Sequence, residues 1–221
     1  MKRRRFLKAD VLAAAPYVVP ASVVGAGAPS NRIHVGCIGT GNQGSQVMKG
    51  FLQETDVRVV AVCDVNTASH GYKHASQYLG REPARKTVEA HYAEQTRSGT
   101  YTGCEAATDF LRVLDRDDID AVTIVVPDQW HAVMAIMAAE RGKDMYCEKP
   151  LSLTVADGRA MVDAVRRTGV VLQTGSHERS RPRTRFACEL VRSGRIGRLT
   201  RIQTVVGPHN KTAPPADWTP M

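Results

Sequence analysis

The chain has 221 residues, of which 43% are hydrophobic and 5% aromatic, and its formal net charge is +8. This length and hydrophobic fraction argue against disorder and allow one large domain, or one and a half domains of ordinary size. Half of the net charge lies in the first ten residues, and the other cations form no stripe interleaved with aromatics, so we expect no nucleic acid partner.

The five cysteines are too few and too widely spaced for a disulfide framework. No two of them form a Cys-x-x-Cys pair, so we expect no structural zinc and no other metal site. Cys37, Cys63 and Cys147 stand inside apolar runs, where a thiol behaves as a small buried hydrophobe. This is typical of a protein that folds in a reducing compartment.

The first 29 residues have the order of features found in an export signal. Residues 3–8 read Arg-Arg-Arg-Phe-Leu-Lys, which resembles the twin-arginine motif. A weakly apolar stretch over residues 11–26 follows, broken by two prolines, and small residues suited to cleavage stand at 26–28. We expect residues 1–29 to be a signal peptide, the twin-arginine export machinery to be a partner, and the protein to be periplasmic or otherwise extracytoplasmic. The alternative is the basic N-terminus of a cytosolic protein.

From Arg32 onward, apolar runs alternate with segments of helical spacing. The apolar runs predict strands over residues 33–38, 57–63, 105–107, 120–126, 145–147, 170–173 and 199–206. The helical spacing predicts helices around residues 47–52, 110–114, 130–142, 154–169 and 186–194. We also expect a polar helix after Asp64, and we interpret residues 81–103 as a loose insertion with some helix.

Alternation of buried strands with helices predicts an α/β fold, a doubly wound parallel sheet of the Rossmann type. We expect residues 30–174 to form this nucleotide-binding domain. The last predicted strand follows a longer gap and has a different pattern, so residues 175–221 are interpreted as the incomplete beginning of a C-terminal domain for substrate binding and dimerisation.

Residues 39–44 match the pattern G-x-G-x-x-G, between a predicted strand and a helix. Gly39 allows the tight turn, Gly41 keeps side chains away from a pyrophosphate, and Gly44 lets helix and strand pack closely. Asn42 and Gln43 open the helix, whose N-terminus carries unpaired N–H groups and partial positive charge. These five residues are the expected phosphate-binding part of a dinucleotide site.

Asp64 ends the second predicted strand, 20 residues after Gly44, where an acidic residue accepts hydrogen bonds from the adenosine ribose. A 2′-phosphate at about 4 Å would be repelled by about 4 kcal/mol for each pair of like charges, before screening, at an effective dielectric of about 20. The residues that follow directly, Val65, Asn66 and Thr67, include no arginine that could bind the phosphate. The expected cofactor is therefore NAD, with NADP less favoured.

Two further motifs follow strands: Pro127 with His131, and Glu148-Lys149-Pro150. Together with the glycine turn and Asp64, they resemble the Gfo/Idh/MocA family of glucose–fructose oxidoreductase and inositol dehydrogenase relatives. The resemblance implies an N-terminal nucleotide-binding domain, a C-terminal α/β domain with dimer contacts, and a homo-oligomeric parent. It also implies that Lys149 reaches the nicotinamide ribose and the substrate hydroxyl.

Lys149 is the expected catalytic residue, because an ammonium beside a carbinol oxygen stabilises the alkoxide that develops as hydride leaves. Glu148 could orient Lys149 or contact the cofactor, or it could form a structural ion pair. His131 could contact the cofactor or only begin a helix, and Pro127 is a further cofactor-side candidate. Trp130 is expected to belong to the core.

His177 and Arg179 follow another predicted strand, where the resemblance places residues that face the nicotinamide and substrate. They are candidates for binding hydroxyls or carboxylates of a sugar-like ligand, and a plain polar loop is the alternative. The resemblance also implies a downstream Asp-x-x-x-His proton-accepting site, and nothing between Arg179 and Met221 matches it. We therefore expect a truncated, inactive fragment of a longer parent.

Three functions fit these observations. The leading hypothesis is hydride transfer between NAD and a carbinol of a sugar, cyclitol or related polyol. The second is a related glycoside-cleaving enzyme that uses bound NAD for a transient oxidation. The third is a non-catalytic NAD-binding module. Export of the folded protein would allow NAD bound in the cytosol to travel in place.

Overall fold

The computed structural model describes residues 31–71 and 74–205. The expected signal peptide, residues 1–29, lies outside them. The chain divides into two compact units, with Gly175 the last residue of the first unit and Ser176 the first residue of the second.

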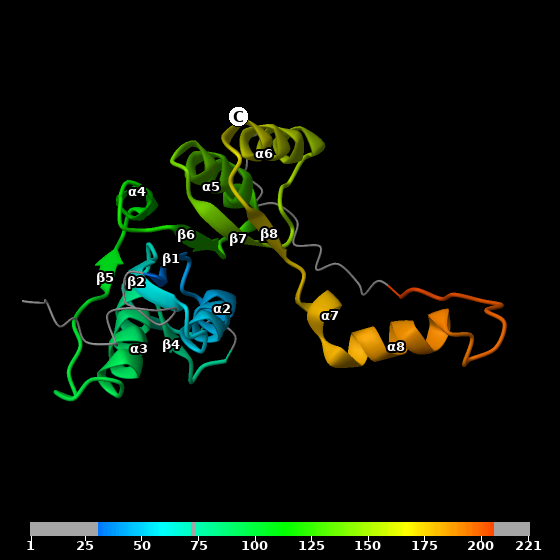
Figure 1. Cartoon of the computed structure of the whole chain (residues 1–221), viewed down its shortest axis with the longest axis horizontal. Coiled ribbons are helices and arrows are strands. Elements are labelled where there is room, and N and C mark those ends of the chain that lie inside the picture. The colour runs from blue at the N-terminus through cyan, green and yellow to red at the C-terminus, as the bar shows by residue number, and fades with distance from the viewer. Residues whose placement is uncertain (1–30, 72–73, 206–221) are drawn as a thin grey trace, which may run out of the picture. The chain divides into compact units, whose positions relative to one another are not determined.

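The first unit is built on one six-stranded sheet in which every pair of neighbouring strands is parallel (Figure 1). Its strands are β1 (Ile33–Ile38), β2 (Val57–Cys63), β5 (Glu105–Ala107), β6 (Ala121–Ile124), β7 (Asp144–Glu148) and β8 (Leu172–Gly175). The spatial order is β5-β2-β1-β6-β7-β8, so the chain winds outward from β1 in one direction and then from β6 in the other. The predicted doubly wound Rossmann sheet is confirmed, with its switch point between β1 and β6.

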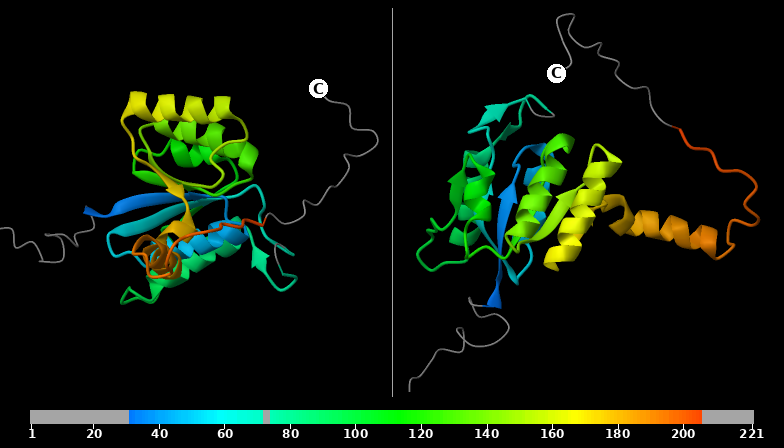
Figure 2. Two further views of the ribbon diagram at one scale, coloured as in Figure 1. Left: turned by 90° about the vertical axis from the view of Figure 1, so that its right-hand side faces the viewer. Right: turned by 90° about the horizontal axis from the view of Figure 1, so that it is seen from above.

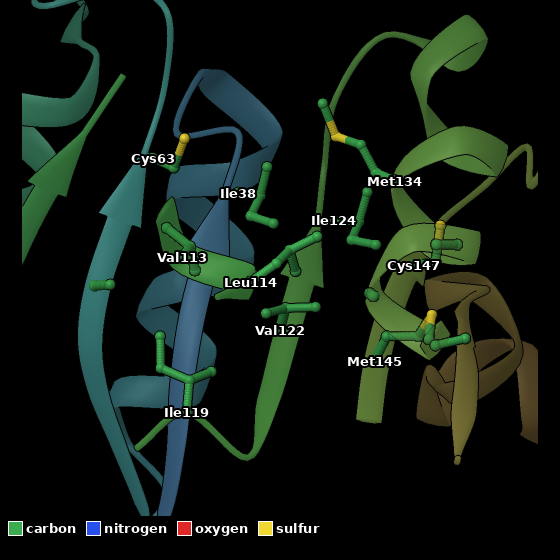
Figure 3. Packing of buried hydrophobic residues seen from close by; sticks show 14 of the residues in the cluster. Ile38, Cys63, Val113, Leu114, Ile119, Val122, Ile124, Met134, Met145 and Cys147 are labelled. Atoms are coloured by element: carbon green, nitrogen blue, oxygen red, sulfur yellow. The ribbon is translucent and has the colours of Figure 1, made fainter. Parts of the chain in front are cut away.

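Helices cover both faces of the sheet (Figure 2). On one face lie α2 (Asn42–Leu52) and α3 (Arg81–Ala93), which share a core cluster with β1 and β2. On the other face lie α4 (Phe110–Leu114), α5 (Asp128–Glu140) and α6 (Val155–Thr168). Figure 3 shows the second cluster, in which side chains of β1, β6 and β7 pack against those of α4 and α5. The inner strands β1, β2 and β6 are buried along most of their length, as expected for a parallel sheet covered on both faces.

Local signals in the sequence explain how α6 begins and ends. Thr154 is the N-cap residue, and its hydroxyl accepts a hydrogen bond from the backbone N–H of Asp157 and donates one to the Asp157 carboxylate. Gly169 ends the helix with a φ of 77°, the left-handed conformation that favours glycine. The predicted N-cap at Thr154 and the C-terminal glycine are both confirmed, whereas the Asp157 carboxylate bonds the Thr154 hydroxyl and not its backbone N–H.

Between β2 and β5 one prediction is wrong and another is confirmed in part. The segment after Asp64 contains no helix in its described residues; it holds two short antiparallel strands, β3 (Ser69–His70) and β4 (Tyr78–Leu79). The helix expected within residues 81–103 is present as α3, but it belongs to the packed domain and not to a loose insertion. Its buried residues Ala84, Val88 and Tyr92 recur every four positions and pack against β2, so α3 is the crossover helix that leads to β5.

The second unit contains α7 (His177–Ser180) and α8 (Pro182–Arg192). α8 confirms the helix predicted around residues 186–194, and Pro182 stands at its first position, where proline is favoured. The strand predicted over residues 199–206 is wrong for its described part, residues 199–205. The described part of this unit contains no strand with which residues 199–205 could pair.

Candidate functional site

The carboxyl edge of the sheet brings together most of the predicted site residues. Gly39 follows β1, Asp64 follows β2, Pro127 stands just beyond β6, and Lys149 follows β7. The edge includes the β1–β6 switch point, where ligands bind in open α/β sheets. The motifs are far apart in sequence, and the parallel arrangement of the strands places them side by side.

Two glycines of the turn, Gly39 and Gly44, stand where a larger residue would meet the backbone. Gly39 has a φ of +84°, and a Cβ built on it would stand 2.0 Å from the carbonyl oxygen of Val125, beyond β6. A Cβ on Gly44 would stand 1.8 Å from the carbonyl oxygen of Gly39. The tight turn predicted for Gly39 and the close packing predicted for Gly44 are therefore both present.

The N-terminus of α2 has the features of an anion site. Gly41 is its N-cap residue and provides no side-chain cap, and Ser45 is the first residue whose N–H bonds back into the helix, to the Gly41 carbonyl at 2.9 Å. The helix dipole adds positive potential at this N-terminus, where backbone N–H groups lie ahead of the first turn. A glycine-rich turn beside a helix without a side-chain cap fits the pyrophosphate of a dinucleotide.

The Asp64 carboxylate is fixed beside this turn. Its Oδ2 accepts hydrogen bonds from the backbone N–H of Thr40 at 2.8 Å and from the Thr40 hydroxyl at 3.3 Å. Its Oδ1 accepts from the backbone N–H of Asn66 at 2.9 Å. The predicted ribose-binding residue and the predicted pyrophosphate-binding turn are thus linked through Thr40, which the sequence analysis did not select because the motif allows any residue there.

One premise of the cofactor prediction needs correction. No arginine follows Asp64 directly, but the fold brings Arg81 to it from 17 residues further along the chain. Arg81 Nη1 donates to the carbonyl oxygens of Asp64 at 3.2 Å and of Val65 at 3.1 Å. Sequence spacing could not reveal this contact, because α3 was not recognised as a helix packed against the end of β2.

Lys149 is exposed, whereas the residue before it is buried. Glu148 is 3% exposed, and its Oε2 accepts a hydrogen bond from the backbone N–H of Lys149 at 3.0 Å. Its Oε1 accepts from Nε2 of Gln43 at 3.3 Å. These contacts join the Lys149 segment to the first turn of α2, and the role of Glu148 toward Lys149 or the cofactor stays a prediction.

His131 holds the other side of the same segment. It lies in the first turns of α5, is 1% exposed, and its Nδ1 hydrogen-bonds the carbonyl oxygen of Pro150. Because a carbonyl only accepts, Nδ1 must donate, which leaves Nε2 buried with no hydrogen-bond partner. Trp130 is 47% exposed, so its predicted place in the core is wrong: α5 buries the stripe that starts at His131.

The thiols at this edge are not nucleophiles. Burial, followed by the nearby Asp64 and Asp109 carboxylates, raises the pKa of Cys63 to about 12. Burial, followed by the charge of Glu148, raises the pKa of Cys147 to about 12. Both therefore stay protonated at neutral pH, and only the thiolate is a strong nucleophile. Their predicted role as buried hydrophobes is confirmed.

The substrate-binding candidates His177 and Arg179 lie in α7, in the second unit. The first unit alone does not test their predicted role, so it stays a prediction. Residues 31–71 and 74–205 hold no group of three His, Cys, Asp or Glu side chains suited to a metal ion. None of their helices is both long and apolar enough to cross a membrane.

The chain is similar to a known protein family and to several known proteins. The sequence model of the Gfo/Idh/MocA oxidoreductase family, described as an NAD-binding Rossmann fold, matches residues 33–176. A "Glycosyl hydrolase family 109 protein" of Shewanella pealeana is 34% identical over 186 residues, 76% of this chain and 38% of that protein. A levoglucosan dehydrogenase of Pseudarthrobacter phenanthrenivorans is 36% identical over 119 residues, 53% of this chain and 30% of that protein.

Among solved structures, a candidate myo-inositol dehydrogenase from Sinorhizobium meliloti aligns with a TM-score of 0.56 and 28% identity. The alignment covers 75% of this chain and 42% of that one. The chain thus spans about two fifths of the length of the first relative and of this structure.

Proposed function

We propose a function from the following premise: this chain belongs to the Gfo/Idh/MocA family of oxidoreductases, and NAD is the cofactor of its Rossmann fold. The whole protein transfers a hydride between NAD and a carbinol carbon of a sugar, cyclitol or similar polyol. The substrate class is supported by the inositol and levoglucosan dehydrogenases among the similar proteins.

The observation that carries this proposal is the position of Lys149. It stands at the carboxyl end of β7, its backbone is held by Glu148 and through Pro150 by His131, and its side chain is exposed. An ammonium held at this edge can donate a hydrogen bond to a carbinol oxygen. It then stabilises the negative charge that grows on that oxygen as the carbon gives up hydride.

The other residues of the edge bind and orient the cofactor. The glycine turn and the first N–H groups of α2 hold the pyrophosphate, and Asp64 accepts from the adenosine ribose hydroxyls. When bound, NAD supplies the hydride acceptor. Glu148 contacts both the Lys149 backbone and Gln43, so it fixes the lysine relative to the cofactor-binding helix.

Two measurements test the proposal in order. Binding of NADH to the 221-residue chain, followed by its fluorescence, should weaken at least tenfold in Asp64→Ala; if wild-type chain binds no NADH, the cofactor role fails. In the whole protein, Lys149→Met should lower kcat at least a hundredfold while NADH affinity stays within threefold. Unchanged turnover in that variant would exclude Lys149 as the catalytic residue and would favour a non-catalytic NAD-binding module.

A second candidate function is supported by the name of the Shewanella pealeana relative, a family 109 glycosyl hydrolase. In such an enzyme NAD would be reduced and reoxidised within one turnover. The two functions differ in their net redox change: a dehydrogenase accumulates NADH with substrate, whereas the glycosidase releases sugar with no net NADH. Turnover in deuterated water adds a second distinction. The glycosidase should release sugar that carries deuterium on the carbon next to the transiently oxidised one, because the carbonyl makes the hydrogen on that carbon exchangeable.

We further propose export by the twin-arginine route, on the evidence of the motif at residues 3–8. Replacing Arg3 and Arg4 by lysine should retain the protein in the cytoplasm in a cell fractionation, and an unchanged distribution would refute this. Mass analysis of the purified exported protein should then find NAD retained. The homo-oligomeric state of the whole protein is a further expectation, open to sedimentation analysis.

A further inference from the structure

The second unit carries a surplus of arginine that the proposed function does not use. Residues 176–205 contain eight arginines, no lysine and two glutamates, whereas in residues 31–175 acidic side chains outnumber basic ones by 18 to 16. The positive charge that the chain carries beyond its first ten residues is therefore concentrated in this segment. A surplus of one sign on so short a segment is a candidate binding surface for the opposite charge.

Ion pairs within this unit involve only two of the eight arginines among its described residues. Arg181 Nε lies 3.1 Å from Oε1 of Glu178, and Arg185 Nε lies 2.8 Å from Oε1 of Glu189. These are the two glutamates of the segment, so residues 176–205 offer no further carboxylate side chain. Six arginines remain exposed and without an ion pair to any residue that the structure describes: Arg179, Arg183, Arg192, Arg195, Arg198 and Arg201.

The end of α8 gathers three of these six arginines. Gly194 follows the helix with a φ of +72°, and the N–H of Arg195 donates back to a carbonyl in the last turn of α8 at 3.1 Å. A second turn follows directly, in which the N–H of Gly197 donates to the carbonyl of Gly194 at 2.9 Å. Arg192, Arg195 and Arg198 stand three residues apart along these two turns, so neighbouring Cα atoms are at most about 11 Å apart. The turns therefore hold three guanidinium groups on one short stretch of chain.

The electrostatics of α8 explain part of this arrangement and leave the rest uncompensated. The C-terminal end of a helix carries partial negative charge, which favours the arginines of the last turn and of the turn beyond it. Arg183 stands instead in the first turn, where the partial charge is positive and where α8 has no acidic side chain. A bound anion would remove the repulsion among these guanidinium groups. Arginine suits that role better than lysine, because its planar fork matches the paired oxygens of carboxylates and similar oxyanions.

We infer that the second unit binds an acidic saccharide, a sugar chain that carries carboxylate or sulfate groups, through the six arginines that form no ion pair. The arginines select the anionic groups by charge. The choice of a saccharide as the carrier of those groups rests on the proposed function, in which the whole protein acts on a sugar or polyol. A nucleic acid is disfavoured, because residues 176–205 contain one aromatic residue, Phe186, whereas single strands are held by several stacking rings.

The test measures binding of the 221-residue chain to immobilised polygalacturonate, dextran sulfate and neutral dextran at about 0.1 M NaCl, where charges more than about 10 Å apart are screened. The better of the two acidic polymers should bind at least about tenfold more tightly than dextran, and its identity names the anionic group. Arg195→Gln/Arg198→Gln should weaken that binding at least about fivefold. The matched control, Arg159→Gln/Arg166→Gln, removes the same charge from exposed positions of α6 and should change the Kd less than about twofold.

Equal weakening by the two pairs of substitutions would overturn the inference, because net charge alone would then explain the binding. Failure of the wild-type chain to bind either acidic polymer more tightly than neutral dextran would overturn it as well. Binding of single-stranded DNA, or of vesicles of anionic lipid, as tightly as the better acidic polymer would overturn the choice of a saccharide. A wild-type chain that binds the polymer but not NADH would instead reject the cofactor site and leave this surface standing, which is a different failure.

Discussion

Replacing Gly44 by alanine should damage both the fold and the cofactor site, because the added methyl group meets backbone and not a movable side chain. The new Cβ would stand 1.8 Å from the carbonyl oxygen of Gly39 and 2.8 Å from its carbonyl carbon. To restore an ordinary contact, the Gly39 turn or the start of α2 must move by about 1 Å or more. The turn is also crowded at Gly39, where a Cβ would stand 2.0 Å from the Val125 carbonyl oxygen, so little free space surrounds it.

Two opposing effects set the size of the change. Overpacking of a tight site costs about 1–3 kcal/mol, and the absence of a rotamer that relieves the clash favours the upper part of that range. Alanine in a helix is favoured over glycine by up to about 1 kcal/mol. The net expectation is a loss of about 1–2 kcal/mol in the free energy of unfolding. Displacement of the pyrophosphate-binding N–H groups should also weaken NADH binding at least tenfold.

Denaturant unfolding and NADH fluorescence measure the two effects, and the same helix offers a matched control. Gly50 also lies in α2, but a Cβ on it would meet nothing within 4 Å. Gly50→Ala should therefore raise stability by about 0.5–1 kcal/mol and leave NADH affinity unchanged. The steric reasoning would be refuted if Gly44→Ala were as stable as Gly50→Ala and bound NADH like the wild type.

Three further predictions concern other parts of the chain. Thr154→Ala should lower the unfolding free energy by about 1 kcal/mol, and Thr154→Ser should restore most of it, as denaturant midpoints can show. At pH 8 a thiol reagent should rapidly modify one cysteine, the exposed Cys188, and the other four only on unfolding; a second fast thiol would contradict the burial described. Those four ionise near their ordinary pKa of 9.0 when unfolded but near a pKa of about 12 when folded. The contribution of these thiols to the free energy of unfolding is therefore full below pH 9, and it falls between pH 9 and 12 by up to about 1.4 kcal/mol per thiol for each pH unit. A free energy of unfolding that does not change over this pH range would refute the raised pKa values of the four thiols.

The sequence allowed the sheet and the cofactor edge to be predicted because their signals are local. A parallel strand buried on both faces reads as a continuous apolar run, and the turns at Gly39 and Asp64 follow such runs directly. The N-cap interaction of α6, between Thr154 and Asp157, is contained within four residues. Each of these features depends on a few neighbouring side chains, so tertiary structure changes it little.

The errors arose where long-range contacts decide the structure. α3 is polar overall, and its narrow buried stripe at Ala84, Val88 and Tyr92 becomes significant only when it packs against β2. Trp130 was assigned to the core by residue type, whereas the helix turns it away from the buried stripe that begins one residue later. Arg81 could not be placed beside Asp64 without knowing where α3 begins.

The backbone on either side of Lys149 makes the contacts that hold this segment, and the Lys149 side chain does not take part in them. Its neighbours bond the backbone on both sides, and no hydrogen bond or ion pair within the described residues involves its Nζ. Another side chain could therefore replace the ammonium with little effect on folding. Under the proposed role of Lys149, a mutation at position 149 would therefore change the chemistry of the site without requiring a compensating change elsewhere in the fold.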